Sequence, residues 1–198
     1  MGYHQAGFEV VGVDIAPQRT YPFDFHQADA LQFVKEAWQD FDVIHASPPC
    51  QRYSNAQRIR HNDHPDLVAP TRSALEETGL PFIIENVMGA PLKNPIMLCG
   101  AMFGIETYRH RLFEFGGGLT VPEPPHPEHV AKTTKMGRWP QPGEYMHIVG
   151  NFCNVDRARK IMEMPWANRD GLREAIPVSY SRYIGKFAFE EWLENSLS

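Results

Sequence analysis

The chain has 198 residues, enough for one domain with a substantial core but too few for two domains of ordinary size. Its 42% hydrophobic and 22% charged residues are typical of a soluble globular protein, and a formal net charge of −5 argues against a protein that merely coats DNA. The N-terminus lacks the basic start and apolar run of a secretory signal, and no stretch approaches about 18 consecutive apolar residues. We therefore expect a cytoplasmic protein.

The three cysteines, Cys50, Cys99 and Cys153, are far apart in the sequence and form no CxxC pair. This spacing argues against a disulfide framework and against a structural zinc site, so the sequence predicts no bound metal.

Strands and helices alternate along the first ninety residues. We expect strands over residues 8–14, 41–46 and 81–87, and helices over residues 28–38 and 67–79. Such alternation is typical of a parallel sheet with right-handed crossovers, in which ligands bind at the carboxyl ends of the strands. Asp14, Cys50 and Glu85 all lie at or just beyond these ends.

The pattern changes after residue 115. Residues 116–145 contain three consecutive glycines and six prolines, which leave little room for regular structure, and long irregular insertions of this kind tend to be functional. Apolar order resumes at residues 147–150, and helices are expected over residues 156–164, 169–175 and 180–193.

Three sequence elements could carry chemistry. Cys50 follows two prolines and precedes a basic loop, conditions that favour a thiolate. Glu85 ends an apolar strand, where partial desolvation would raise its pKa and let it share a proton with a substrate nitrogen. Arg109 and Arg111 alternate in an apparently extended segment, so both guanidiniums are expected to face one pocket.

Taken in order, residues 47–51 (Ser-Pro-Pro-Cys-Gln), 85–87 (Glu-Asn-Val) and 109–111 (Arg-His-Arg) resemble the motif set of the DNA (cytosine-5) methyltransferases, particularly small phage and prophage forms. The resemblance implies an α/β fold, specifically the Rossmann-like fold of S-adenosylmethionine-dependent methyltransferases, with a mostly parallel sheet. It divides the chain into a catalytic and cofactor-binding part (1–115), a short irregular target-recognition insert (116–145) and a return to the catalytic domain (146–198).

The resemblance also implies S-adenosylmethionine as the cofactor. Asp14 matches the acid that holds the ribose hydroxyls, Asp29 resembles the acid near the adenine amino group, and the segment around Ser179 closes the pocket. The full set of expected cofactor contacts is Asp14, Ile15, Asp29, Ala30, Pro48 and Ser179.

The expected substrate is double-stranded DNA, with the target cytosine turned out of the duplex. Cys50 would add to C6, Glu85 would hold N3 and the exocyclic amine, and Arg111 together with Arg109 would position the base, its phosphate or Cys50. DNA contacts are expected from the loop after Cys50 and from the insert beside Trp139, namely from Gln51, Arg52, Arg58, Arg60, Lys132, Lys135 and Arg138.

The chain also departs from the family. It begins after the segment that would carry the first strand and the first glycine-rich loop, so we expect a break in the centre of the sheet and weak cofactor binding. Two alternatives stay open: an RNA cytosine-5 methyltransferase, and a DNA-binding or regulatory remnant with little activity. Ser47 and Cys50 argue against an adenine amino-methyltransferase. The sequence implies no membrane or protein partner and does not distinguish restriction-modification from self-protection or regulation.

Overall fold

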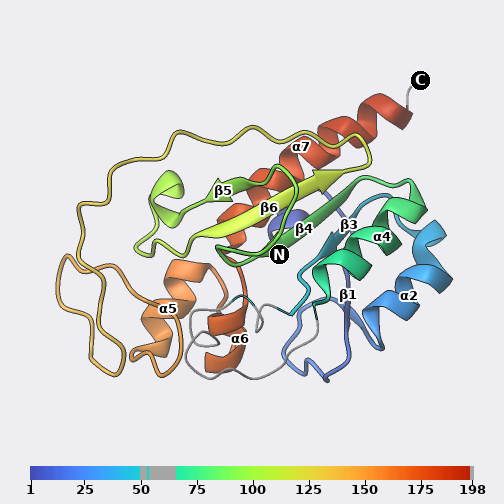
Figure 1. Cartoon of the computed structure of the whole chain (residues 1–198). Helices are drawn as coiled ribbons and strands as arrows, with labels where there is room; N and C mark the ends of the chain where they lie inside the picture. Colours follow the sequence, from blue (N-terminus) through green and yellow to red (C-terminus); the bar gives the residue numbers. More distant parts are fainter. Residues whose placement is uncertain (50–52, 54–65, 197–198) are drawn as a thin grey trace.

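The computed structural model describes residues 1–49, 53 and 66–196, which form a sheet covered by helices (Figure 1). The first part comprises α1 (Gly2–Gln5), β1 (Val11–Asp14), β2 (Asp24–Gln27), α2 (Ala30–Ala37), the 3-10 helix η1 (Trp38–Asp40), β3 (Ile44–Ala46), α4 (Val68–Thr78) and β4 (Phe82–Asn86). The second comprises β5 (Ile96–Leu98), the 3-10 helix η3 (Gly100–Phe103), β6 (Arg111–Gly116), α5 (Val155–Met162), α6 (Arg169–Glu174) and α7 (Val178–Ser196). No helix in these residues has the length and apolarity needed to cross a membrane.

The strands form two sheets. β1 pairs with β2 in parallel, and the larger sheet has the order β3-β4-β6-β5. β3 and β4 are parallel, whereas β6 runs antiparallel to both of its neighbours. The expectation of a mostly parallel sheet is therefore wrong for the second half. No long helix follows β4 or β5 before β6, and parallel strands need such a crossover while antiparallel strands do not.

The break expected in the sheet is present among the described strands. β1 and β3 each have a ladder partner on one side, and no pairing joins them to each other. An unpaired strand edge leaves backbone N–H and C=O groups without sheet partners, so this break is the least regular part of the α/β architecture.

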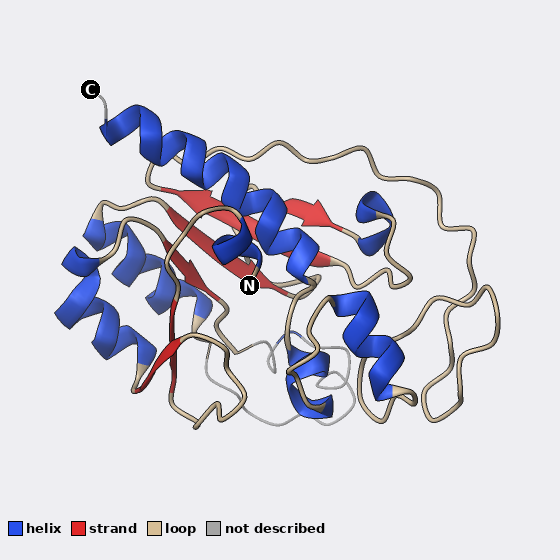
Figure 2. Cartoon of the chain, turned by 180° about the vertical axis from the view of Figure 1, so that it is seen from behind, coloured by secondary structure: helices blue, strands red, loops and turns tan. Residues whose placement is uncertain are grey.

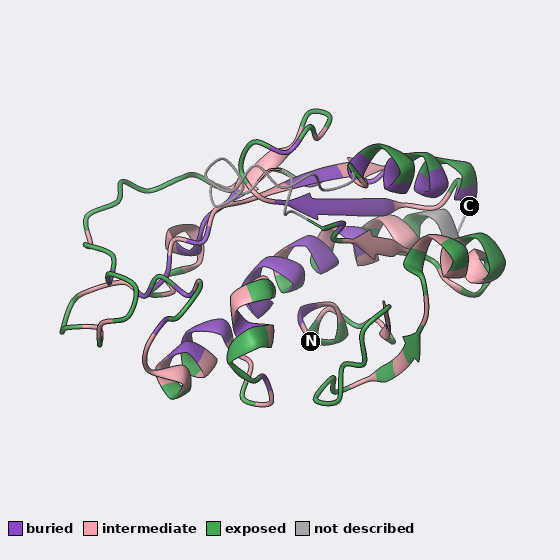
Figure 3. Ribbon diagram, turned by 60° about the horizontal axis from the view of Figure 1, so that its bottom comes forward, coloured by how far each residue is buried: buried purple, intermediate pink, exposed green. Residues whose placement is uncertain are grey.

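The larger sheet is buried on both faces, with α7 across one face and α4 on the other (Figures 1 and 2). All five residues of β4 are buried (Figure 3). Successive side chains of a strand point to opposite faces, so those of β4 alternate between the two layers. Ile83 packs in the α7 layer with Phe113, whereas Phe82 and Ile84 pack with Leu75 of α4. The alternation places Glu85 on the same face as Ile83, at the carboxyl end of the strand.

The expected insert is irregular, as its composition predicts. An isolated parallel bridge joins Thr133 to Tyr145 and closes a loop over residues 134–144. The chain then enters a second small core, built around α5 and α6 and separate from the sheet. The segment between β6 and this helical unit is therefore long and exposed over much of its length (Figure 3).

A buried ion pair fastens α4 to β6. The Nε and Nη2 atoms of Arg72 donate to the two carboxylate oxygens of Glu114 at 2.6 and 2.7 Å, and Nη2 also donates to the Pro91 carbonyl at 2.9 Å. The Lys93 backbone N–H donates to the same carboxylate at 2.7 Å. The side chains are only 11% and 3% exposed, so neither charge can be satisfied by water if its partner is removed.

We expect Glu114→Ala to lower the free energy of unfolding by about 3–5 kcal/mol, because it leaves the Arg72 guanidinium buried without its counter-charge. Glu76→Ala is the matched control. It breaks the ion pair between Glu76 and Lys93, whose side chains are 51% and 62% exposed. That change should cost at most about 1 kcal/mol. Urea unfolding of the three proteins measures both values, and similar losses in the two variants would contradict the prediction.

Candidate functional site

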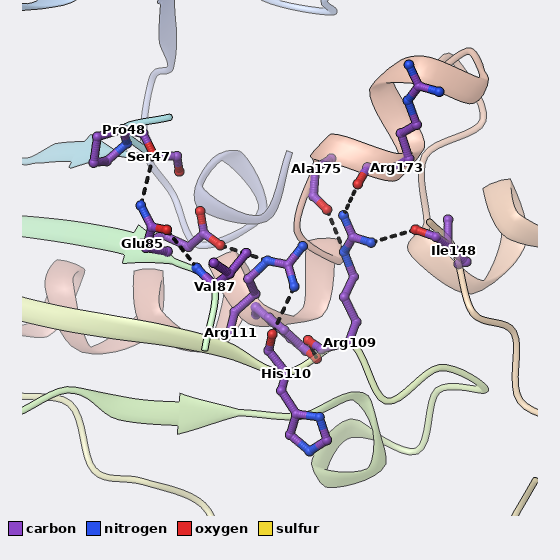
Figure 4. Close-up of polar contacts among 12 residues, drawn as sticks. Ser47, Pro48, Glu85, Val87, Arg109, His110, Arg111, Ile148, Arg173 and Ala175 are labelled. Carbon is purple, nitrogen blue, oxygen red and sulfur yellow. Dashed lines mark hydrogen bonds and ion pairs between the residues drawn. The ribbon is translucent and has the colours of Figure 1, made fainter. Parts of the chain in front are cut away.

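The carboxyl ends of β3 and β4 hold the segment that leads to Cys50. Asn86 is 1% exposed, and its Nδ2 donates to the Pro48 carbonyl at 2.9 Å, while its Oδ1 accepts from the Val87 backbone N–H (Figure 4). Asn86 therefore fixes the start of the Pro-Pro turn against the neighbouring strand. Cys50 itself, like Gln51, Arg52, Arg58 and Arg60, lies outside the described residues.

Glu85 is the buried acid of this edge. Its carboxylate lies 3.0 Å from Nε of Arg111, the residue that starts β6, and also contacts the Ser47 side chain. Burial raises the pKa of Glu85 above its ordinary value, and Arg111, Ser47 and the more distant charge of Arg109 only partly offset this rise. The sequence predicted this raised pKa from the position of Glu85 at the end of an apolar strand.

Arg109 and Arg111 have different partners among the described residues, since Arg109 bonds to backbone carbonyls and Arg111 pairs with Glu85 (Figure 4). The Arg109 guanidinium donates to the backbone carbonyls of Ile148, Arg173 and Ala175 at 2.7–2.8 Å. Arg109 precedes β6 and has a φ of 32°, so the extended alternation of side chains is lost at this residue. The end of α6 then offers carbonyl groups that lack helical partners, and Arg109 satisfies them. We infer a positioning role for Arg109 rather than contact with substrate.

Two residues near Glu85, His45 and Tyr3, were not predicted from the sequence as part of the site. His45 of β3 hydrogen-bonds through Nε2 to Ser47 Oγ at 3.2 Å and through Nδ1 to the hydroxyl of Tyr3. Tyr3 belongs to α1, which packs so closely on α7 that a Cβ on Gly2 would lie 2.4 Å from backbone atoms of α7. A hydrogen-bonded series thus runs from α1 through His45 and Ser47 to Glu85. The sequence did offer one signal for this series, since the polar residues His45 and Ser47 alternate at the end of a strand.

Burial lowers the pKa of His45 from 6.5 to about 4, because it disfavours the charged imidazolium. The unfolded chain binds a proton at this residue below about pH 6.5, whereas the folded protein does not. The stability that the neutral ring contributes is complete above about pH 6.5 and is lost as the pH falls toward 4.

We expect the wild-type protein to lose on the order of 2 kcal/mol more unfolding free energy than His45→Gln between about pH 7 and about pH 5. Urea unfolding at the two pH values measures this difference. His26→Gln, which changes an exposed histidine of β2, is the control and should behave like the wild type. Equal losses in the wild type and His45→Gln would show that His45 titrates alike in the folded and unfolded states.

Four of the six expected cofactor residues, Asp14, Ile15, Asp29 and Ala30, lie at or just beyond the carboxyl ends of β1 and β2. The Asp14 carboxylate accepts from the Ala16 backbone N–H at 2.8 Å and from Gln18 Nε2 at 3.2 Å. Ile15, next in sequence, is 74% exposed and offers an apolar surface beside this acid. Asp29 caps α2 by accepting from the Gln32 N–H, which leaves Ala30 at the first position of that helix. An acid with an adjoining exposed apolar side chain fits a ribose and its purine.

Ser179 lies in the first turn of α7, is 5% exposed, and its Oγ has no hydrogen-bond partner among the residues described. It lines a groove of about 480 Å³ together with Phe103 and Tyr183. A second cavity of about 560 Å³ surrounds Phe8 and Phe23. Asp14, Ile15, Asp29 and Ala30 line neither cavity, so the structure does not bring them together with Ser179 in one of these two cavities.

The basic residues of the insert differ in their contacts. Lys132 and Lys135 are exposed, whereas Arg138 donates to both carboxylate oxygens of Glu144 at 2.6 and 2.8 Å. Trp139 lies beside this pair and is 61% exposed. Arg138 therefore shapes the loop, and the exposed lysines and indole are the groups that the loop presents to solvent.

No protein-family model matches this sequence. The chain is similar to the type II methyltransferase M1.HphI of Haemophilus parahaemolyticus, with 24% identity over 228 aligned residues. The alignment covers 90% of this chain and 60% of the relative, so the chain spans about three fifths of that protein's length. The similarity extends over almost the whole chain and is to a methyltransferase.

Proposed function

We propose that this protein is a DNA (cytosine-5) methyltransferase that uses S-adenosylmethionine. The observation that carries the proposal is the buried Glu85, paired with Arg111 at the sheet edge from which the Pro-Pro-Cys segment departs. Similarity to a type II methyltransferase supports the transfer of a methyl group and DNA as the substrate. The relative's name specifies no base, so the choice of cytosine C5 depends on Cys50, Glu85 and Arg111.

The site residues divide the reaction between them. Protonated Glu85 donates to N3 of a flipped cytosine, which reduces the charge that builds on the ring when the Cys50 thiolate adds to C6. Arg111 holds the Glu85 carboxyl group in place and favours its return to the ionised form. S-adenosylmethionine, when bound, supplies an electrophilic methyl group, and Asp14 with Ile15 would hold its nucleoside end. Loss of the C5 proton then allows the bond between Cys50 and C6 to break.

A second candidate is a DNA-binding protein of the same ancestry with little catalytic activity. The unpaired edges of β1 and β3 favour this alternative, and so does the position of Asp14, Ile15, Asp29 and Ala30 outside the lining of both cavities. Equilibrium binding of S-adenosylmethionine to the chain separates the two candidates.

Glu85→Gln should reduce methyl transfer at least about 100-fold, since the amide cannot donate and then regain a proton at N3. Incorporation of labelled methyl groups into DNA measures the loss, with Glu76→Gln on the exposed face of α4 as the control. DNA containing 5-fluorocytosine should trap a covalent adduct with the wild type and none with Cys50→Ala. Normal turnover in Glu85→Gln, or an adduct that survives Cys50→Ala, would overturn the assignment.

Substitution of Arg109 is expected to affect stability, whereas substitution of Arg111 is expected to affect activity. Arg109→Gln is expected to lower the free energy of unfolding by about 2–4 kcal/mol, because buried carbonyls lose charged donors. Arg111→Gln should instead reduce turnover and move the pH dependence of the reaction, because the pKa of Glu85 rises further without its counter-charge. Thermal melts and pH-rate profiles of both variants test this division. An Arg109→Gln protein of normal stability without activity would restore a catalytic role for Arg109.

A further inference from the structure

Four metal-ligating side chains converge where the insert passes the β5–β6 edge. Cys99 follows β5 and caps η3, His110 directly precedes β6, and His126 and His129 belong to the insert. Their ligand atoms all lie within 4.8 Å of one another. The wide spacing of the cysteines in the sequence had argued against a metal site. In the structure, β6 runs antiparallel beside β5 and brings His110 close to Cys99.

We propose that Cys99, His110, His126 and His129 bind one zinc ion, which fastens the insert to the sheet beside the Glu85–Arg111 pair. One thiolate and three imidazoles suit zinc and other late first-row metals, whereas calcium and magnesium require oxygen ligands. Four protein ligands complete a tetrahedral shell and leave no position for substrate, so the ion would be structural.

Two of the ligand separations are close to those of a tetrahedral site. Zinc–sulfur bonds of about 2.3 Å and zinc–nitrogen bonds of about 2.0–2.1 Å require ligand separations of about 3.6 Å between S and N and about 3.3 Å between two N atoms. Cys99 Sγ lies 3.3 Å from His129 Nε2, and that nitrogen lies 3.2 Å from His126 Nε2. His110 stands slightly farther off, with its ring centre 5.0 Å from that of His129.

Hydrogen bonding alone serves this cluster poorly. His129 Nε2 faces both a thiol and a second imidazole nitrogen, yet a neutral ring nitrogen has either one proton to donate or one lone pair to offer. Protonation of both His126 and His129 would place two positively charged rings with their nitrogens only 3.2 Å apart. A bound cation satisfies all the lone pairs at once.

Neighbouring residues contact two of the four proposed ligands, Cys99 and His129. The Cys99 sulfur accepts hydrogen bonds from the backbone N–H groups of Ala101 and Met102, which hold it at the start of η3. Tyr108 stacks on His129 with ring centres 3.6 Å apart, and its hydroxyl hydrogen-bonds to both the N–H and the carbonyl of Ala131. The His110 ring points away from the Arg109 and Arg111 guanidiniums, toward the opposite side of the strand (Figure 4). One ligand therefore lies next in sequence to a residue of the candidate active site.

The test is zinc binding by the full chain, first stripped with a chelator and then titrated with Zn²⁺ against a chromophoric competitor. We expect one equivalent per chain and a rise in melting temperature on zinc addition. His126→Asn and His129→Asn should weaken the affinity at least about 100-fold and abolish that rise, since even the loss of groups that only orient ligands costs 10–100-fold. Both histidines are exposed, so these variants should fold without metal. His26→Asn is the matched control and should bind like the wild type.

Cobalt substitution identifies the sulfur ligand. The Co²⁺ protein should show the intense visible bands of a tetrahedral site and a thiolate charge-transfer band, which Cys99→Ser removes and Cys153→Ser preserves. The proposal is overturned if the wild type binds no more zinc than His126→Asn. It is equally overturned if the charge-transfer band survives Cys99→Ser, or depends instead on Cys50.

Discussion

The pairing of β4 with β6 is the constraint on which the rest of the site depends. Glu85 and Arg111 lie 26 residues apart in the sequence, on β4 and β6. They meet because the antiparallel register sets Glu85 opposite Phe113, which is two residues from Arg111 and on the same face of β6. The opposite face of the same two strands carries the buried Arg72–Glu114 pair. The Glu85–Arg111 pair thus joins β4 to β6, and the Arg72–Glu114 pair joins β6 to α4. A shift of one residue in the register of β6 would exchange its two faces and separate both pairs.

Local patterns in the sequence predicted the first half well. Strands ending near Asp14, Ala46 and Asn86, and the helix that Gly79 terminates, lie within three residues of their expected bounds, because apolar runs and turn residues determine them locally. The raised pKa of Glu85 also followed from its place at the end of a buried strand. The patterns did not predict β2, β5 or β6. The direction of β6 depends on tertiary pairing, and so do the different partners of Arg109 and Arg111.

The remaining features depend on contacts distant in sequence. His45 is an ordinary strand residue until Tyr3, from the N-terminal helix, reaches its ring. The cluster of Cys99 with three histidines spans thirty residues of chain and has no regular spacing. Both involve polar groups that packing brings together from segments distant in the sequence. Topology, more than local propensity, therefore decides which polar side chains of this chain become neighbours.

The bridge between Thr133 and Tyr145 has a consequence for how such a protein can diverge. Backbone hydrogen bonds close the loop at its base, and they require no particular side chains at the tip. Met136 and Trp139 project there with 59% and 61% of their surfaces exposed, outside every hydrophobic cluster. Met136 and Trp139 can thus be replaced without cost to the core, so that new surface chemistry can arise in this loop while the pair of Arg138 and Glu144 keeps its shape.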